Sequence, residues 1–171
     1  MKKAFLFIAL LGLLAAPAYS GSKIISVNPV GIVFGVPNVN VEMVKPSGLN
    51  PVFGGSLYIY SSGGWSTFGL GLSGGVRKYL QAGKTGEGLY AGAYGGLGFL
   101  SAKYAGESTT SVLFSLTGAI GYKAVFSDKY VIGLEGGLSI YLNSGITIAG
   151  TSLGMYSGVA PYGALELGLK I

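Results

Sequence analysis

The sequence predicts an all-β protein, a single closed antiparallel transmembrane β-barrel with eight strands as the preferred count. Charged residues make up 10% of the 171 residues, whereas a soluble domain carries about 25%. No stretch has the composition of a transmembrane helix, because the longest uncharged segments, 49–76 and 143–165, are rich in the Gly, Ser and Tyr that suit strands and loops. Since lipid requires every backbone polar group to be paired, a closed barrel is the remaining option.

The clearest element is a pair of alternating strands in Ser111–Leu142, joined by the polar turn Ser127–Lys129. Successive side chains of a strand point to opposite faces, so each strand has one apolar face and one small, polar or charged face. This pattern is typical of a transmembrane hairpin with lipid outside and a polar lumen inside. The predicted lipid-facing side chains are Val112, Phe114, Leu116, Ile120, Tyr122, Phe126, Tyr130, Ile132, Leu134, Leu138, Ile140 and Leu142.

The N-terminal 1–20 segment is predicted to be a secretory signal peptide. It begins with Lys2 and Lys3, continues with the apolar run 4–15 and ends in small residues that fit cleavage before Tyr19 or Gly21. An uncleaved membrane anchor is the alternative, although the apolar run is short for a span. We therefore expect residues 21–171 to form the barrel and the mature protein to lie in the outer membrane of a Gram-negative envelope.

The next segment, Lys23–Val44, has an ambiguous pattern. Apolar residues occupy even positions from Val30 to Val36 and odd positions from Val39 to Met43. This change of parity is compatible with one bulged strand or with two strands joined by a Pro-Asn turn, and two strands is the preferred interpretation. If the segment is one strand, a count of eight requires another strand within 146–155.

The remaining strands are predicted at Val52–Tyr60, Thr67–Leu80, Leu89–Ser101 and Tyr162–Ile171, and Asn143–Gly158 is predicted to be the longest loop. An even strand number returns the C-terminus to the side on which the chain enters. With a periplasmic C-terminus, the turn at 127–129 is periplasmic, and the loops near 61–65, 104–110 and 143–158 face outward.

Several segments resemble a domain-of-unknown-function family of small bacterial outer-membrane barrels. The residues that carry the resemblance are ISVNPVGIVFGVPNVNVE, LYAGAYGGLGFL and GAIGYKAVFSDKYVIGLEGGL. That family has an N-P-aliphatic-G opening, a Glu about a dozen residues later and a hairpin with a G-Y-aromatic-turn pattern. The chain is more loosely similar to OmpA/OmpX-type eight-stranded proteins, although it ends in Ile171 where such barrels usually end in Phe. The resemblance implies the barrel fold and insertion by the outer-membrane assembly machinery, and it implies no activity.

Charged residues on the predicted inward faces are the main candidate site. An eight-stranded barrel is wide enough only to be filled by side chains, and buried charges must pair. We expect a lumen charge network that plugs the barrel; a narrow, gated ion path is the alternative. Inward tyrosines are expected to fill the lumen over glycines, with ligand stacking as a second possibility. The network residues are Glu42, Arg77, Lys123, Glu135, Glu166 and Lys170, and the lumen aromatics are Tyr58, Tyr90, Tyr94 and Tyr141.

No catalytic, metal or cofactor site is predicted. The chain has no His and no Cys, which excludes a histidine base, a thiolate metal site and disulfides. The GxGxxG match at 69–74 continues a strand pattern, whereas a nucleotide site needs a following helix. Without Lys2 and Lys3, nine scattered basic residues face six acidic ones, so nucleic acid is not an expected partner.

These observations predict a monomer without enzymatic activity, in contact with outer-membrane lipid, with a plugged lumen and a structural or surface-interaction role. A small passive porin-like channel is the alternative, and a secreted soluble β-barrel with an apolar ligand is a third hypothesis. An external binding partner is not indicated by any motif.

Overall fold

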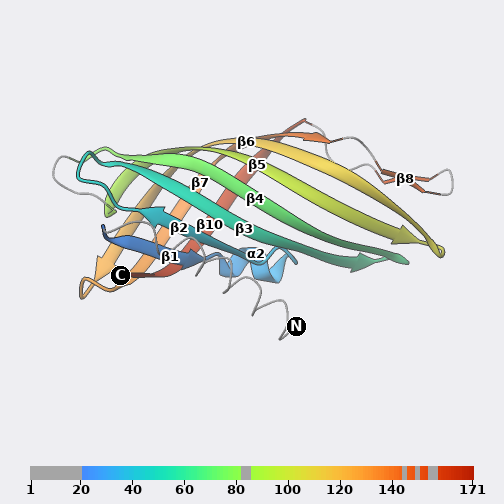
Figure 1. Cartoon of the computed structure of the whole chain (residues 1–171), viewed down its shortest axis with the longest axis horizontal. Helices are drawn as coiled ribbons and strands as arrows, with labels where there is room; N and C mark the ends of the chain where they lie inside the picture. Colours follow the sequence, from blue (N-terminus) through green and yellow to red (C-terminus); the bar gives the residue numbers. More distant parts are fainter. Residues whose placement is uncertain (1–20, 82–85, 144–145, 149–150, 154–157) are drawn as a thin grey trace.

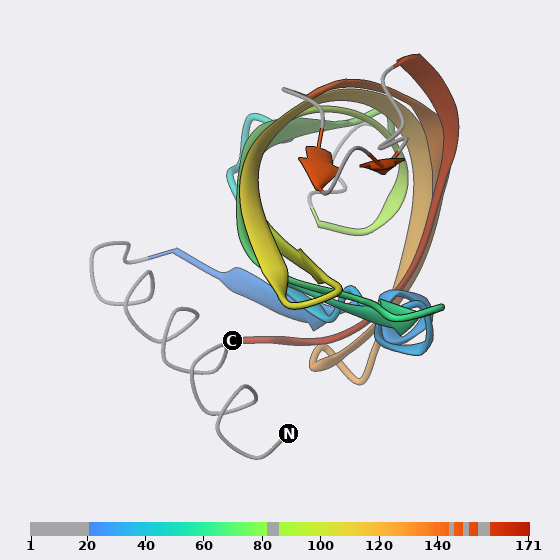
Figure 2. The same ribbon diagram turned by 90° about the vertical axis from the view of Figure 1, so that its right-hand side faces the viewer.

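The computed structural model describes residues 21–81, 86–143, 146–148, 151–153 and 158–171. The predicted signal peptide, residues 1–20, lies outside the described residues. Eight antiparallel strands close into one barrel in the order β1-β10-β7-β6-β5-β4-β3-β2, which confirms the predicted fold (Figures 1 and 2). The barrel strands are β1 (Lys23–Val27), β2 (Asn38–Met43), β3 (Leu49–Ser62), β4 (Trp65–Tyr79), β5 (Gly88–Tyr104), β6 (Glu107–Phe126), β7 (Tyr130–Asn143) and β10 (Gly158–Lys170).

The two ends of the barrel differ in what they carry. Lys23 and Ile171 are joined by paired backbone hydrogen bonds of 2.7 and 2.8 Å, so the first and last strands meet at one end, which we call the terminal end. The β6–β7 turn is at the same end, and the tight β3–β4 and β5–β6 turns are at the opposite, loop end (Figure 1). The strands exceed the predicted ranges at several of these turns.

The β6–β7 turn shows how local sequence determines strand register. Ser127 and Asp128 both have positive φ, 51° and 53°, and Lys129 N–H donates to Phe126 O at 3.0 Å. This is a type I′ turn, whose twist matches that of the flanking strands. It pairs Phe126 with Tyr130, and from that pair the register continues to Leu113 and Asn143.

Side-chain exposure follows the predicted alternation in β6 and β7. Leu116, Ile120, Leu134 and Leu138 are 60–64% exposed on the outer surface, whereas the alternate residues from Thr109 to Val125 and from Val131 to Tyr141 are buried or half-buried. One departure is Leu57 of β3, which has outward parity but is 3% exposed. The barrel therefore presents apolar side chains outward and polar ones inward, the reverse of a soluble barrel.

The segment between β1 and β2 differs from the prediction because it contains a helix. Two strands are present, as preferred, but residues 29–33 form a short helix, α2 (Pro29–Val33), where alternation predicted strand up to Val36. Asn28 caps the helix by accepting a hydrogen bond from Gly31 N–H at 3.2 Å, and Pro29 occupies the first turn, where its missing N–H costs nothing. The Asn-Pro-Val-Gly opening is thus a helix start rather than part of a strand.

The predicted long loop at 143–158 also contains structure. β8 (Ile146–Ile148) pairs with β9 (Thr151–Leu153) as a separate two-stranded sheet, which lies at the loop end of the barrel, where β8 contacts β6 and β5 (Figure 1). The segment is the longest connection between two barrel strands, as predicted, and the hairpin within it was not predicted because its residues alternate poorly between apolar and polar.

The wall of the barrel is complete only toward the terminal end. β1 pairs with β10 from Val27↔Leu167 to Ile24↔Lys170, whereas β10 pairs with β7 along almost its full length, from Gly158 to Leu169. Nearer the loop end the chain leaves β1 and forms α2, which contacts β10 and lies beside it (Figure 2). In this half, α2 takes the place that β1 has in the terminal half.

Candidate functional site: a charge cluster and a polar cavity in the lumen

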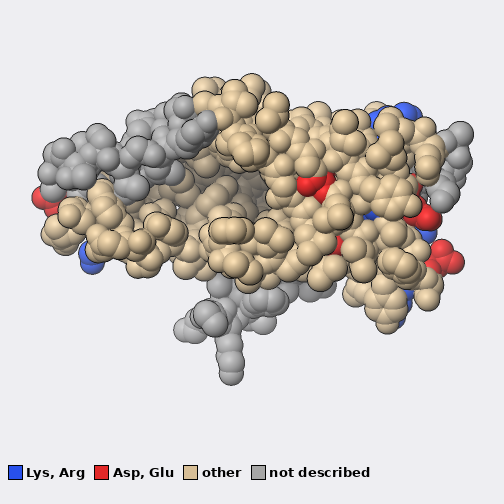
Figure 3. Space-filling model, turned by 180° about the vertical axis from the view of Figure 1, so that it is seen from behind, with Lys and Arg blue, Asp and Glu red and all other residues tan. Residues whose placement is uncertain are grey.

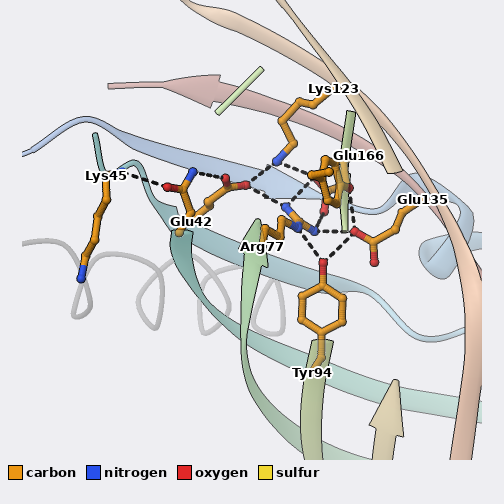
Figure 4. A network of polar contacts seen from close by, with 9 residues as sticks. Glu42, Lys45, Arg77, Tyr94, Lys123, Glu135 and Glu166 are labelled. Carbon is orange, nitrogen blue, oxygen red and sulfur yellow. Dashed lines mark hydrogen bonds and ion pairs between the residues drawn. The ribbon is translucent and has the colours of Figure 1, made fainter. Parts of the chain in front are cut away.

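Five charged side chains from five strands meet in the terminal half of the lumen (Figure 4). We call them the lumen charge cluster: Glu42 on β2, Arg77 on β4, Lys123 on β6, Glu135 on β7 and Glu166 on β10. All five are at most 6% exposed. The structure therefore brings together five of the six residues of the predicted network.

Glycines opposite these residues leave space for their long side chains. Gly133 of β7 is the register partner of Lys123 on one side and of Glu166 on the other. A Cβ built on Gly133 would already be in van der Waals contact with Glu166, at 3.5 Å from its Cβ and its Oε2. The missing side chain at Gly133 therefore leaves room between Lys123 and Glu166, whose charged groups meet the other members of the cluster in the lumen.

Arg77 is the hub of the cluster. Its Nη1 donates to Glu42 Oε2 at 2.9 Å and to Glu166 Oε2 at 3.2 Å, and its Nη2 donates to Glu135 Oε2 at 3.0 Å and to Glu166 Oε1. The fifth donor, Nε–H, binds the Tyr94 hydroxyl at 2.7 Å. A guanidinium has five N–H donors, and all five are used within the barrel.

Lys123 supplies the second positive charge. Its Nζ lies 2.5 Å from Glu42 Oε2 and 3.1 Å from Glu166 Oε2. The other Glu42 oxygen accepts from Asn50 Nδ2 at 2.7 Å, and Asn50 Oδ1 accepts from Lys45 N–H at 2.9 Å. Asn50 is fully buried and was missed by sequence reasoning, because its position before Pro51 placed it outside the predicted strand.

Glu135 is held differently from the other carboxylates. Its Oε2 accepts hydrogen bonds from Tyr90 at 2.6 Å, Tyr94 at 2.9 Å and Arg77. Its Oε1 is buried and has no hydrogen-bond partner among the described residues. In formal charge, three carboxylates face two cations, so the cluster carries one net negative charge.

Lys170, the sixth residue of the predicted network, does not join the cluster. It lies at the end of β10, on the same strand parity as Glu166 but four residues farther on. That separation is roughly 13 Å along a strand. Its side chain is half-buried, and within the described part of the chain it forms no ion pair with the cluster residues.

Tyrosines fill the space around the charges and lie over glycines. A Cβ on Gly121 would collide with the Tyr90 ring, one on Gly75 would lie 2.6 Å from the Tyr94 ring, and one on Gly71 would lie 2.9 Å from the Tyr58 ring. Tyr90 is fully buried, and the Arg77 guanidinium carbon lies 4.9 Å from its ring centroid. Three predicted lumen tyrosines therefore pack on glycines of the neighbouring strand.

The loop-end side of the cluster opens into a polar cavity of about 190 Å³. Tyr58, Tyr94 and Tyr141 line it, together with Tyr162, which was not among the predicted lumen aromatics. Among the described residues of the lining, Arg77 is the one ionisable group other than tyrosine. The other polar side chains of the lining are neutral: Asn28, Asn38, Asn40, Ser56, Ser73, Ser115 and Thr117.

Other classes of site have little support in the geometry. The described residues contain no group of three or more acidic, His or Cys side chains placed to hold a metal ion. The GxGxxG match at 69–74 lies inside β4, which continues as strand to Tyr79. Within the described part of the chain, no helix is long and apolar enough to cross a membrane.

The barrel is similar in fold to a known surface protein. The crystal structure of Neisserial surface protein A superposes with a TM-score of 0.54 over 88% of this chain and 92% of that one, at 12% sequence identity. At this identity the likeness shows the fold alone. No protein-family model and no curated protein sequence matches the chain, so the resemblance to the small-barrel family with the N-P-aliphatic-G opening stays a prediction.

Proposed function

We propose that the protein is a small outer-membrane barrel with a lumen plugged by the charge cluster, and that its role is structural or surface-interacting rather than catalytic. The observation that carries this proposal is the inverted arrangement of side chains. Leucines at 60–64% exposure lie outside while ion pairs at most 6% exposed lie inside. Exposing that much apolar surface to water is unfavourable, and a bilayer removes the cost.

Strand length supports the membrane location. A tilted strand needs about 9–11 residues to cross the hydrocarbon core, and β4, β5 and β6 have 15, 17 and 20 residues. The exposed aromatics Tyr122, Phe126 and Tyr130 lie at the terminal end of β6 and β7, where an interfacial girdle is expected. Outer-membrane lipid and the assembly machinery are accordingly the proposed partners of a monomeric barrel.

The plug rests on the contacts of Arg77. It is bound to carboxylates from β2, β7 and β10, so it links β4 to three other strands. Moving it aside to open an ion path would break five hydrogen bonds at once. Hydrogen bonds to charged groups contribute about 1.5–3 kcal/mol each, so this geometry favours a closed lumen over a passive channel.

Planar-bilayer recording of the refolded protein tests the plug. We expect no stable unit conductance from the wild-type protein. A reproducible unit conductance that changes or disappears in Glu135→Gln or Lys123→Met would replace the plug with the channel hypothesis. The observation that favours the channel as a second candidate function is the net negative charge of the cluster. An excess of negative charge in the lumen would attract cations.

The membrane location has its own test. Because the chain lacks cysteine, Leu134→Cys, which is outward-facing on β7, and Ser115→Cys, which faces the cavity from β6, form a pair of labelling sites. A fluorophore at 134 should be quenched by lipids with a quencher in the acyl chain, and one at 115 should be protected. Equal protection at both positions, or recovery of the mature protein from the soluble periplasm, would favour the soluble-barrel hypothesis.

A further inference from the structure

The polar cavity adjoins the part of the barrel wall where β1 is replaced by α2. The cavity is lined by Asn28, Val36 and Asn38, from the segment between the end of β1 and the start of β2 that contains α2, and by Tyr162 and Ala164 of β10. The cavity is therefore bounded by both sides of the seam between this segment and β10. Figure 3, which views the barrel from the side opposite to Figure 1, shows the surface hollowed near mid-length.

This seam is unusual for a barrel in lipid. From Pro161 to Glu166, β10 is paired with β7, but the register with β1 begins only at Leu167. Pro161 suits such an edge because it has no N–H to leave unpaired. Open sheet edges are not tolerated against hydrocarbon, and they occur at membrane depth only where protein covers them or where they line a polar cavity.

The two sides of the seam have opposite character. Outside, α2 and its C-cap present Val33 and Phe34, which are 82% and 73% exposed. Inside, the cavity offers amides, hydroxyls and tyrosine rings. Asn38 Oδ1 is buried there without a hydrogen-bond partner in the described part of the chain, and such an acceptor is costly unless a water or a ligand donates to it.

The charges at the floor of the cavity indicate that a ligand is uncharged. An anionic headgroup would need free cationic donors, but all five Arg77 donors are used by Glu42, Glu135, Glu166 and Tyr94. The cluster at the cavity floor also carries a net negative charge and would repel a phosphate or sulfate. The neutral amides, hydroxyls and aromatic faces instead match an uncharged, hydroxyl-bearing group.

We propose that this cavity binds the uncharged, polyhydroxylated head of an amphiphile, which enters from the membrane through the seam between α2 and β10 while its apolar tail remains against α2 outside. The proposal rests on the membrane location proposed above. A volume of about 190 Å³ is somewhat larger than a cavity of ~150 Å³ that holds a benzene ring, which suits a head of one sugar ring or a glycerol unit.

The test uses the full mature chain refolded in phosphocholine micelles and titrated with dodecyl glucoside as the probe, followed by NMR. We expect saturable shifts of the Asn38 side-chain amide and contacts between sugar protons and the Tyr58 and Tyr94 rings. Dodecyl sulfate should give no saturable shift at the same mole fraction. Free glucose should bind at least ten-fold more weakly than dodecyl glucoside, because it lacks the tail that contacts α2.

Two variants and one control locate the site. Asn38→Leu removes the unpartnered acceptor, and Thr117→Trp fills the cavity; each should weaken dodecyl glucoside binding at least ten-fold. Leu116→Ala, adjacent to Thr117 but outward-facing, should bind as the wild type does. If Asn38→Leu fails to refold, as judged by heat-dependent migration on gels, Thr117→Trp alone decides the outcome.

The proposal is overturned by shifts that rise linearly without saturation, by binding that survives Thr117→Trp, or by free glucose binding as tightly as dodecyl glucoside. Each of these results leaves the membrane barrel intact, because refolding in micelles and lipid quenching at position 134 are measured separately. A protein that stays folded and soluble without detergent would instead refute the membrane location on which the proposal depends.

Discussion

Among single substitutions in the lumen, removal of the Arg77 charge should lower the free energy of unfolding the most. Arg77→Met keeps much of the apolar stem but removes five hydrogen bonds and leaves Glu135 and Glu166 facing each other with Lys123 as the remaining cation of the cluster. The formal charge of the cluster then changes from −1 to −2. Breaking a buried ion pair by removing one partner costs about 3–5 kcal/mol, and we expect the upper part of that range because three carboxylates lose a partner.

Urea unfolding in phospholipid vesicles measures this loss. The chain has a single tryptophan, Trp65, which stacks on Tyr104 at the loop end with a 4.4 Å centroid separation. Its fluorescence therefore reports on a region remote from the substitution. With a slope of about 2 kcal/mol per molar urea, the midpoint for Arg77→Met should fall by roughly 2 M.

A control variant and a double-mutant cycle test whether the loss of stability comes from the contacts of Arg77 with the carboxylates. Lys78→Met removes the adjacent, exposed cation and should change stability by less than about 0.5 kcal/mol. Glu135→Gln removes the excess negative charge, so it should cost far less than Arg77→Met and should partly rescue it in the double variant. A loss below about 1 kcal/mol for Arg77→Met, or no coupling with Glu135, would show that the cluster does not hold the barrel closed.

Three further outcomes are expected from other parts of the barrel. In one strand, Gly121→Ala should be strongly destabilising in the same urea assay, because the new Cβ collides with the Tyr90 ring, whereas Gly118→Ala should be nearly neutral because nothing lies within 4 Å of its Cβ. Replacing Ser127-Asp128 by Asn-Gly should raise stability by about 0.5–1 kcal/mol, because these residues suit the positive φ angles of the turn; an unchanged midpoint would contradict the type I′ assignment. Asn50→Leu should cost about 1–3 kcal/mol, because Glu42 loses its 2.7 Å donor, and an equal cost on a Glu42→Gln background would contradict that coupling.

The parts of the fold that the sequence predicted are those that repeat along the chain. Alternation in Ser111–Leu142 recurs in every long strand, and a two-residue period assigns each side chain to one face without knowledge of its contacts. This was enough to place Lys123 and Glu135 inside the barrel. It was not enough to place Lys170 correctly relative to the cluster, because distance along a strand matters as well as face.

The helix α2 was not predicted because alternation of apolar residues does not distinguish such a short helix from a strand. Residues 30–36 alternate as a strand does, and a five-residue helix is too short to show a 3.6-residue period. The signal that was available is local: Asn28 followed by Pro29 is a helix start, with a capping side chain and a residue that lacks an N–H. The specific ion pairs could not be predicted either, because they depend on the relative stagger of β2, β4 and β10, which turns elsewhere in the chain determine.

The two halves of the lumen differ in the charge of their side chains, and this difference follows the structure of the surrounding wall. In the terminal half, β1 and β10 are paired, and the enclosed charges are paired with one another. In the loop-end half, α2 replaces β1, and the described residues that line the cavity are neutral apart from Arg77 at its floor. In the proposed membrane location, a charge placed near the seam would lie next to hydrocarbon, where an unpaired charge is expensive, whereas amides and hydroxyls can bind either water or a polar head. The position at which the β1–β10 ladder ends therefore divides the barrel into a half that holds the charge cluster and a half that holds the polar cavity, and in the proposed membrane location α2 separates that cavity from lipid.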